Sequence, residues 1–135
     1  MRVIVIGLVF ISNLGFGQQP ELTDEQLNKS GAVRLVLADS SISIALDFAK
    51  SDMENGTPFL LLQGGISPVV YGTDRDFERK YKVYFHDYGC TGPNEKLSAA
   101  YNSWTFDYLT KKYGTKWIEE VRKDVIGLKD WKEKK

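Results

Sequence analysis

The sequence predicts a single α/β domain whose small, mainly parallel sheet has three strands, with helices packed on its faces. Short apolar runs, which are typical of buried strands, alternate along the chain with segments whose apolar residues recur at helical spacing. Hydrophobic residues make up 42% of the composition, which allows a packed core without disulfides. The expected order is strand, helix, strand, helix, strand, helix, helix. Such alternation places helices on the faces of a mainly parallel sheet.

The amino-terminal segment has the features of a secretory signal peptide. Arg2 supplies a positive charge, residues 3–14 form a mostly apolar run, and small residues precede a cleavage site before Gln18. The apolar run is shorter than the roughly 20 residues that a membrane-spanning helix needs. We therefore expect removal of residues 1–17, no stable membrane insertion afterwards, and a secreted or periplasmic protein.

Residues 18–31 are expected to form a linker with one short helix, followed by the single domain at residues 32–128. Thr23 and Gln26 form a capping-box pattern, which predicts that the short helix begins there. The run at residues 32–38 is apolar apart from one charge, and it predicts the first strand.

A helix and a second strand follow. Apolar residues at helical spacing predict a helix over residues 41–54, and Asn55-Gly56 suits its left-handed end. The short apolar run at residues 59–62 lies between helix breakers, so it predicts a buried strand.

The stretch from Thr73 to Cys90 predicts a short helix that passes directly into the third strand. Thr73 and Asp76 form a second capping-box pattern, and Asp76 and Lys80 have the spacing of a helical ion pair. Phe77 and Tyr81 share one helical face. From Tyr81 to His86 the residues are largely β-branched or aromatic and alternate as a strand requires.

Two helices are expected to complete the domain. The longer one is predicted to have Pro93 at its first position and to end at Gly114. The next is predicted to start after Thr115 and to stop at Gly127, leaving residues 129–135 as a charged tail.

Several motifs in this part of the chain occur in a fixed order. They are Phe77–Tyr81, a strand ending in Asp87–Cys90, Tyr101-Asn102, residues 108–114, Trp117 and residues 124–128. In this order they resemble the FEKKY domain, a family of small exported proteins from bacteria of the Bacteroidota type that is named for the pentapeptide. Arg79 stands here where the name has lysine, which keeps the charge. The resemblance covers roughly Gly64 to Leu128; it implies an exported location and kinship, and it transfers no catalytic residue.

The candidate catalytic residues are His86, Asp87 and Cys90, which lie in one turn at the carboxyl end of the expected third strand. Open α/β sheets bind their ligands at such ends. A cysteine whose pKa is lowered by an imidazole or by a helix amino terminus would be a thiolate nucleophile. The alternative interpretation is structural: Cys90 is a small buried hydrophobe, Gly89 makes the turn, and His86 and Asp87 point to opposite faces of the strand. A thiol that binds a metal or pairs with another chain is a third.

No cofactor or metal site is predicted. One thiolate, one imidazole and scattered carboxylates match no standard ligand spacing. Gly64-Gly65 after a buried strand resembles the start of a phosphate loop, but the nucleotide-binding glycine patterns are absent and a tight turn is the simpler interpretation.

Charge and aromatic content favour a binding role. The chain has 18 basic and 18 acidic residues, so it lacks the basic excess expected of a nucleic-acid partner. Aromatic residues at helical spacing in the last two helices would pack on the sheet or, where exposed, contact a protein or glycan partner. They are Tyr101, Trp104, Phe106, Tyr108, Tyr113 and Trp117. We therefore predict a binding or accessory protein of the cell envelope with an unidentified partner. The alternative is a thiol-dependent enzyme that uses Cys90 with His86.

Overall fold

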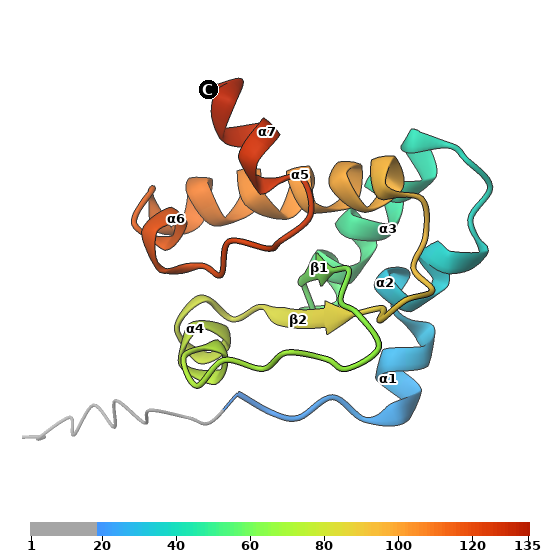
Figure 1. Cartoon of the computed structure of the whole chain (residues 1–135), viewed down its shortest axis with the longest axis horizontal. Helices are drawn as coiled ribbons and strands as arrows, with labels where there is room; N and C mark the ends of the chain where they lie inside the picture. Colours follow the sequence, from blue (N-terminus) through green and yellow to red (C-terminus); the bar gives the residue numbers. More distant parts are fainter. Residues whose placement is uncertain (1–18) are drawn as a thin grey trace, which may run out of the picture.

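The computed structural model describes residues 19–135, so the expected signal peptide lies outside the described residues. The helices are α1 (Asp24–Lys29), α2 (Gly31–Arg34), the 3₁₀ helix η1 (Leu35–Leu37), α3 (Ile42–Glu54), α4 (Asp74–Tyr81), α5 (Glu95–Tyr113), α6 (Trp117–Glu120) and α7 (Leu128–Glu133), and the strands are β1 (Phe59–Leu62) and β2 (Tyr84–Asp87) (Figure 1). The capping box of Thr23 and Gln26 is present at the start of α1, as predicted.

The two strands pair in parallel, with Phe59 opposite Tyr84 and Leu62 opposite Asp87. The chain between them contains α4, so the mixed helix and sheet class and the parallel pairing agree with the prediction. The prediction of a third strand does not: within residues 19–135 the sheet has two strands.

The expected first strand at residues 32–38 is helical instead. The carboxylate of Asp52 in α3 accepts hydrogen bonds from the backbone N–H groups of Gly31 and Ala32, at 2.6 and 2.8 Å, and the Ser30 hydroxyl accepts one from Val33. These acceptors satisfy the first N–H groups of α2, which a helix leaves without internal partners. A contact 21 residues away in the chain therefore outweighs the strand preference of this apolar run.

Asn102 closes the outer edge of β1, where a third strand would otherwise pair. The side-chain oxygen of Asn102 accepts from the Leu61 N–H at 2.8 Å, and its amide nitrogen donates to the carbonyls of Leu61 and Ile126. Beside it, Val125 forms a single antiparallel bridge with Leu62. One buried side chain and one bridge thus replace a strand.

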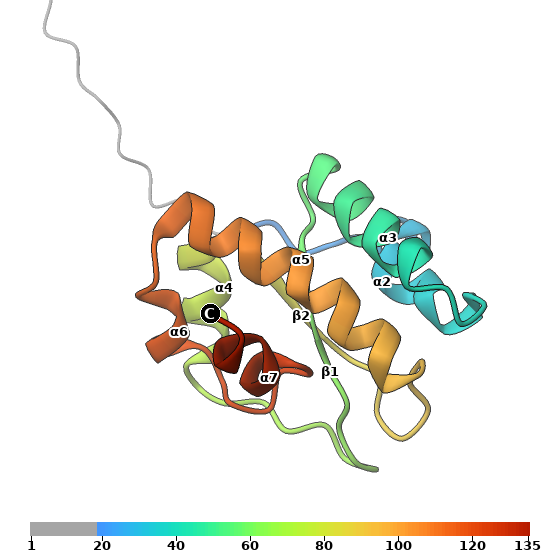
Figure 2. The same ribbon diagram turned by 90° about the horizontal axis from the view of Figure 1, so that it is seen from above.

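The hydrophobic core has two parts, one on each face of the sheet. Alternate side chains of β1 enter each part, Phe59 and Leu61 on one face and Leu60 and Leu62 on the other. Figure 2 shows α2 and α3 on one side of α5 and α4, α6 and α7 on the other. Of the six aromatic residues predicted to pack in the last helices, three are fully buried, Tyr108 and Tyr113 are partly buried, and Trp104 is 37% exposed. The buried three are Tyr101, Phe106 and Trp117.

Helix α4 forms as predicted, but its polar contacts differ from those expected. Thr73 makes no side-chain cap, and Asp76 pairs with Arg79 at 2.6 Å, not with Lys80. Lys82 adopts a left-handed conformation between α4 and β2, so the helix does not run directly into the strand.

The carboxyl-terminal region also departs from the prediction. The long helix α5 is capped by Asn94, so Pro93 precedes it. Helix α6 ends at Glu120, so the helix predicted up to Gly127 stops early; residues 121–127 contain two turns and meet the edge of β1 at Val125. The expected charged tail forms α7, because Trp131 packs on Phe106, with ring centroids 5.2 Å apart.

Candidate functional site

The structure places His86 and Asp87 at the end of β2 and Cys90 in the turn that follows, so the three residues do not share one turn as predicted. None of them is joined to another by a hydrogen bond within the described chain. Cys90 is exposed, contrary to the structural interpretation of a buried hydrophobe. The His86 ring lies edge-on to the Tyr88 ring, with centroids 4.6 Å apart, and near Phe59 at 6.1 Å. These aromatic contacts turn the imidazole towards the α1 side of the sheet.

Asp87 has a structural task in the turn. Its Oδ1 atom accepts hydrogen bonds from the backbone N–H groups of Gly64, at 3.0 Å, and Gly89, at 2.7 Å. A Cβ atom on Gly64 would lie 2.5 Å from the Asp87 carboxylate, so a larger residue there would displace this carboxylate. The backbone N–H of the first glycine after β1 thus meets an anion from within the protein. Residues 63–65 form no turn, so the tight-turn prediction is not confirmed.

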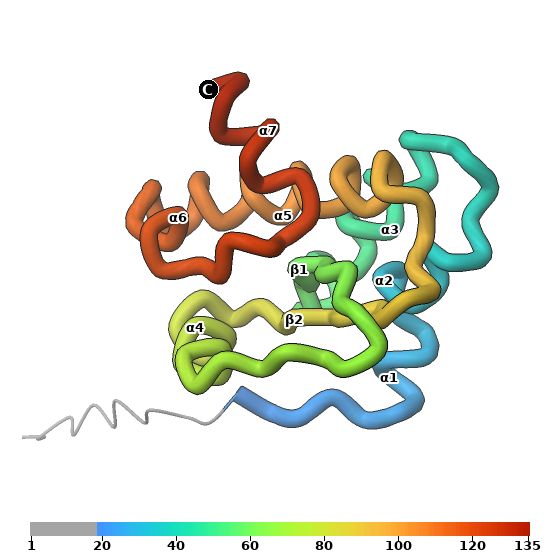
Figure 3. The backbone as a smooth tube through the Cα atoms, in the orientation of Figure 1, coloured from blue at the N-terminus to red at the C-terminus, as the bar shows by residue number. Residues whose placement is uncertain are grey.

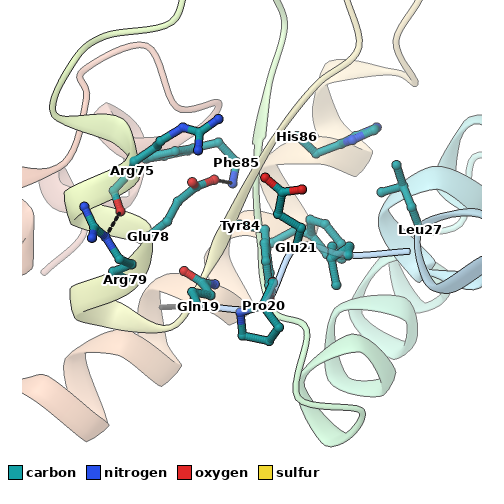
Figure 4. Close-up of a pocket in the computed structure, with 12 residues that line it drawn as sticks. Gln19, Pro20, Glu21, Leu27, Arg75, Glu78, Arg79, Tyr84, Phe85 and His86 are labelled. Carbon is teal, nitrogen blue, oxygen red and sulfur yellow. Dashed lines mark hydrogen bonds between the residues drawn. The ribbon is translucent and has the colours of Figure 1, made fainter. Parts of the chain in front are cut away.

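A cleft of about 690 Å³ opens beside His86, between α4, β2 and the amino-terminal segment (Figure 4). Figure 3 shows residues 19–23 passing below α4 and β2. Two hydrogen bonds hold this segment in place, from the Gln19 side chain to the Val83 carbonyl and from the Tyr84 hydroxyl to the Pro20 carbonyl, at 2.9 and 3.0 Å. The lining combines aromatic, aliphatic and charged side chains: Gln19, Pro20, Glu21, Leu22, Leu27, Phe59, Arg75, Glu78, Arg79, Tyr84, Phe85 and His86.

Helix α4 supplies the charged wall of the cleft. Glu78 and Arg79 lie three and four residues after Arg75, so both are neighbours of Arg75 on the helix surface. The Glu78 Oε1 atom accepts from the Phe85 N–H at 2.8 Å. Arg79 is paired with Asp76, whereas the guanidinium of Arg75 has no ion-pair partner within 4 Å among residues 19–135.

Two ionisable groups in the cleft have displaced pKa values. Burial raises the pKa of Glu78 above its usual 4.5, although the hydrogen bond from Phe85 opposes this shift. Burial also lowers the pKa of His86 below its usual 6.5, against the opposing charge of Asp87. His86 is therefore predominantly neutral at pH 7 and offers the cleft a nitrogen acceptor as well as a donor.

A second, smaller cavity of about 240 Å³ lies on the opposite face of the sheet. It shares Arg75, Glu78 and Phe85 with the larger cleft, and its other walls come from β1, β2 and the segments around residues 68–74 and 122. The two cavities therefore flank one stretch of β2.

Arg122 holds the loop that covers the second cavity. Its side chain, 6% exposed, donates to Asp74 at 2.9 Å and to the Val69 carbonyl at 3.0 Å, and it lies over the Tyr71 ring. Asp124 binds the same guanidinium through two hydrogen bonds of 2.7 Å. This network fixes a loop whose apolar residues are exposed, including Ile66 at 94% and Val70 at 75%.

Metal ligands do not gather in the part of the chain that the structure covers: residues 19–135 contain no group of three or more histidine, cysteine or carboxylate side chains able to hold an ion. No helix in the same range is long and apolar enough to cross a membrane.

The cleft is a site that the sequence did not reveal. Arg75, Glu78 and Arg79 were readable as one polar helical face, but nothing in their spacing indicates that β2 and residues 19–27 complete the walls. His86 is the one predicted site residue that lines the cleft; Asp87 lines the second cavity, and Cys90 lines neither.

Comparisons of the chain with family models, with curated proteins and with solved structures find no match. The resemblance to the FEKKY domain therefore stays a prediction from the motifs themselves.

Proposed function

We propose that this chain is an exported binding protein of the FEKKY type, an accessory component of the cell envelope whose ligand occupies the cleft between α4, β2 and residues 19–27. The observation that carries this proposal is Arg75, a guanidinium without an ion-pair partner among the described residues, at the rim of a cleft with aromatic walls. A volume of about 690 Å³ is within the range of about 300 to 1,000 Å³ that is usual for ligand sites.

The polar groups of the cleft favour recognition over catalysis. Glu78 is engaged with the Phe85 backbone, and His86 is oriented by aromatic rings without a hydrogen-bond partner in residues 19–135. A general base needs a partner that fixes its ring and a nucleophile within reach. Cys90 lies outside the cleft lining, so the thiol-dependent alternative has less support than binding.

A fragment titration tests the proposal. The ¹⁵N-labelled protein, residues 18–135, would be titrated with a library of carboxylates, phosphates, sugars and aromatic fragments and followed by amide chemical shifts. We expect the shifts to gather at residues 20–27, 75–79 and 84–86. Arg75→Ala should weaken the carboxylate fragments selectively, whereas Arg34→Ala, an exposed arginine outside the cleft, should not.

Two results would overturn the proposal. If the chemical-shift changes gather elsewhere, or if no fragment causes any change, the cleft is not a binding site. Turnover in a hydrolase and thiol-transfer screen that is lost in Cys90→Ser would favour the enzyme alternative, whereas the same variant should leave fragment binding unchanged.

A further inference from the structure

The backbone of β2 has one edge that faces away from β1. In a parallel ladder alternate residues point their N–H and C=O groups to opposite sides. The N–H groups of Tyr84 and Tyr88 donate to β1 neighbours, the Pro58 and Leu62 carbonyls, so the backbone groups of Val83, Phe85 and Asp87 point outwards.

Side chains and one backbone carbonyl of α4 satisfy part of this outer edge, since the Val83 N–H donates to the Glu78 carbonyl at 3.3 Å. Gln19 binds the Val83 carbonyl and Glu78 binds the Phe85 N–H. The Phe85 carbonyl and the Asp87 N–H have no hydrogen-bond partner among residues 19–135. Buried or half-buried backbone groups are normally paired, so this edge has room for an incoming donor and acceptor.

The two cavities lie where the side chains of an added strand would point. The larger cleft contacts Tyr84 and His86, whose side chains face one side of the sheet, and the smaller cavity contacts Asp87 and Leu62, which face the other. Successive residues of a strand point to opposite faces. Cavities on both sides of an open strand edge are the arrangement by which proteins bind an extended peptide, with backbone bonds for affinity and pockets for alternate side chains.

We propose that the ligand is an extended peptide that pairs with the outer edge of β2 as a third strand; this rests on the proposed function. One of its side chains enters the larger cleft, and the next enters the cavity beneath Val69 and Val70, which suits a small apolar residue. A carboxylate of the peptide pairs with Arg75, which lines both cavities and has no ion-pair partner in residues 19–135. Glu78 holds the Phe85 N–H until the peptide takes it.

The first arm of the test is a selection of random nonapeptides displayed on phage, using the protein of residues 18–135. Selection uses the wild type alone, and the binding of each enriched peptide is then measured on Arg75→Ala, with Arg34→Ala as the matched control. We expect enriched sequences that carry an acidic residue and an apolar residue in adjacent positions. Enriched peptides that bind Arg75→Ala as well as the wild type would overturn the assignment of the carboxylate.

The second arm is a backbone N-methyl scan of one selected peptide. Because only alternate amides of a paired strand donate to its neighbour, methylation should weaken binding by about tenfold at every second position and little in between. Glu78→Ala should strengthen binding, because it removes the group that competes for the Phe85 N–H. Sensitivity without alternation, or weaker binding to Glu78→Ala, would overturn strand pairing.

The two proposals fail in different ways. If carboxylate or aromatic fragments bind the cleft while no peptide is enriched, the peptide inference is wrong and the binding function stands. If neither fragments nor peptides bind there, both are wrong.

Discussion

Asn102 is a single amide group that holds three segments together, since it bonds both backbone groups of Leu61 and the carbonyl of Ile126. Asn102→Ala should lower the free energy of unfolding by about 2 to 5 kcal/mol, because the buried Leu61 N–H loses its acceptor and a cavity remains. Urea denaturation followed by circular dichroism measures this change.

The neighbouring residue provides the control. The Ser103 hydroxyl bonds only the Ala100 carbonyl of its own helix, so Ser103→Ala should change stability by less than about 0.5 kcal/mol. Asn102→Asp keeps the acceptor for Leu61 but directs a charge at two carbonyls, so it should be less harmful at acidic pH. Equal stability of the Asn102 and Ser103 alanine variants would contradict the closing role of the amide.

Glu78 should make stability depend on pH in the acidic range. Its pKa is raised by burial above 4.5, so the native state binds this proton more tightly than the unfolded chain does. The resulting stabilisation is complete below the unfolded pKa and is lost as pH rises through the native pKa. The stability of the wild type relative to Glu78→Gln should therefore fall as pH rises from 4.5. Urea denaturation of both proteins across this range tests it, and a constant difference would contradict the shift.

His86 should act in the opposite direction. Its pKa is lowered below 6.5, so its contribution to stability is present above that pH and is lost as pH falls through the native pKa. Below pH 6.5 the wild type should lose stability relative to His86→Gln. An NMR titration of the imidazole carbon-bound protons gives the native pKa independently, and a midpoint above 6.5 would contradict the burial that we describe.

At the scale of an element, α4 joins a structural face to a binding face. The Phe77 side chain is 5% exposed, and its ring centroid lies 4.7 Å from that of Tyr81 and 5.5 Å from that of Phe85. Phe77→Ala should lower the free energy of unfolding by about 3 to 5 kcal/mol, because a buried aromatic ring is lost and a cavity remains. Arg79→Ala should cost less than about 0.5 kcal/mol, because its ion pair with Asp76 is solvent-exposed.

Denaturant melts of the two α4 variants decide between a packing motif and a recognition motif. If Phe77→Ala had no effect on stability while Arg79→Ala abolished ligand binding, the pentapeptide would be a recognition surface first. Glu78 already departs from the expectation that the charged residues between Phe77 and Tyr81 lie mostly in water, because it is half-buried against the Phe85 backbone.

Elements with strong local signals were predictable, and those set by distant contacts were not. Residues 42–54 and 59–62 follow their apolar periodicity, with breakers on either side. The run at 32–38 has the composition of a strand, yet Asp52 in another helix caps it as α2. At the outer edge of β1, the Asn102 side chain makes the hydrogen bonds that a third strand would make. No periodicity in the sequence indicates such a contact.

At the scale of the whole molecule, the expected export has a direct test. Mass spectrometry of the protein secreted from a Bacteroidota-type host should find Gln18, or its cyclised form, as the first residue, because the signal pattern places the cut after Gly17. Gly17→Trp provides the control, because a large residue directly before the cleavage site should block signal-peptide cleavage. A protein that retains Met1 outside the cytoplasm would contradict the assignment.

The candidate site was predictable only in part, because distant segments of the chain form its walls. A turn was correctly expected at the carboxyl end of this strand, although His86 and Asp87 belong to β2 itself. The cleft is built by residues 19–27, α4 and β2 together. The hydrogen bonds that join the amino-terminal wall to Val83 and Tyr84 span 64 positions of the chain, so no local sequence pattern predicts this contact.

The hydrogen bonds of Gln19 and Pro20 to β2 have a practical consequence for anyone attaching this protein to a surface or a fusion partner. A body attached at the amino end would sit at the mouth of the cleft. Figure 1 shows the carboxyl end beyond α5, on the opposite side of the molecule from residues 19–23. A tether after Lys135 would hold the protein with its cleft directed outwards, so carboxyl-terminal tags are the ones compatible with every binding measurement described above.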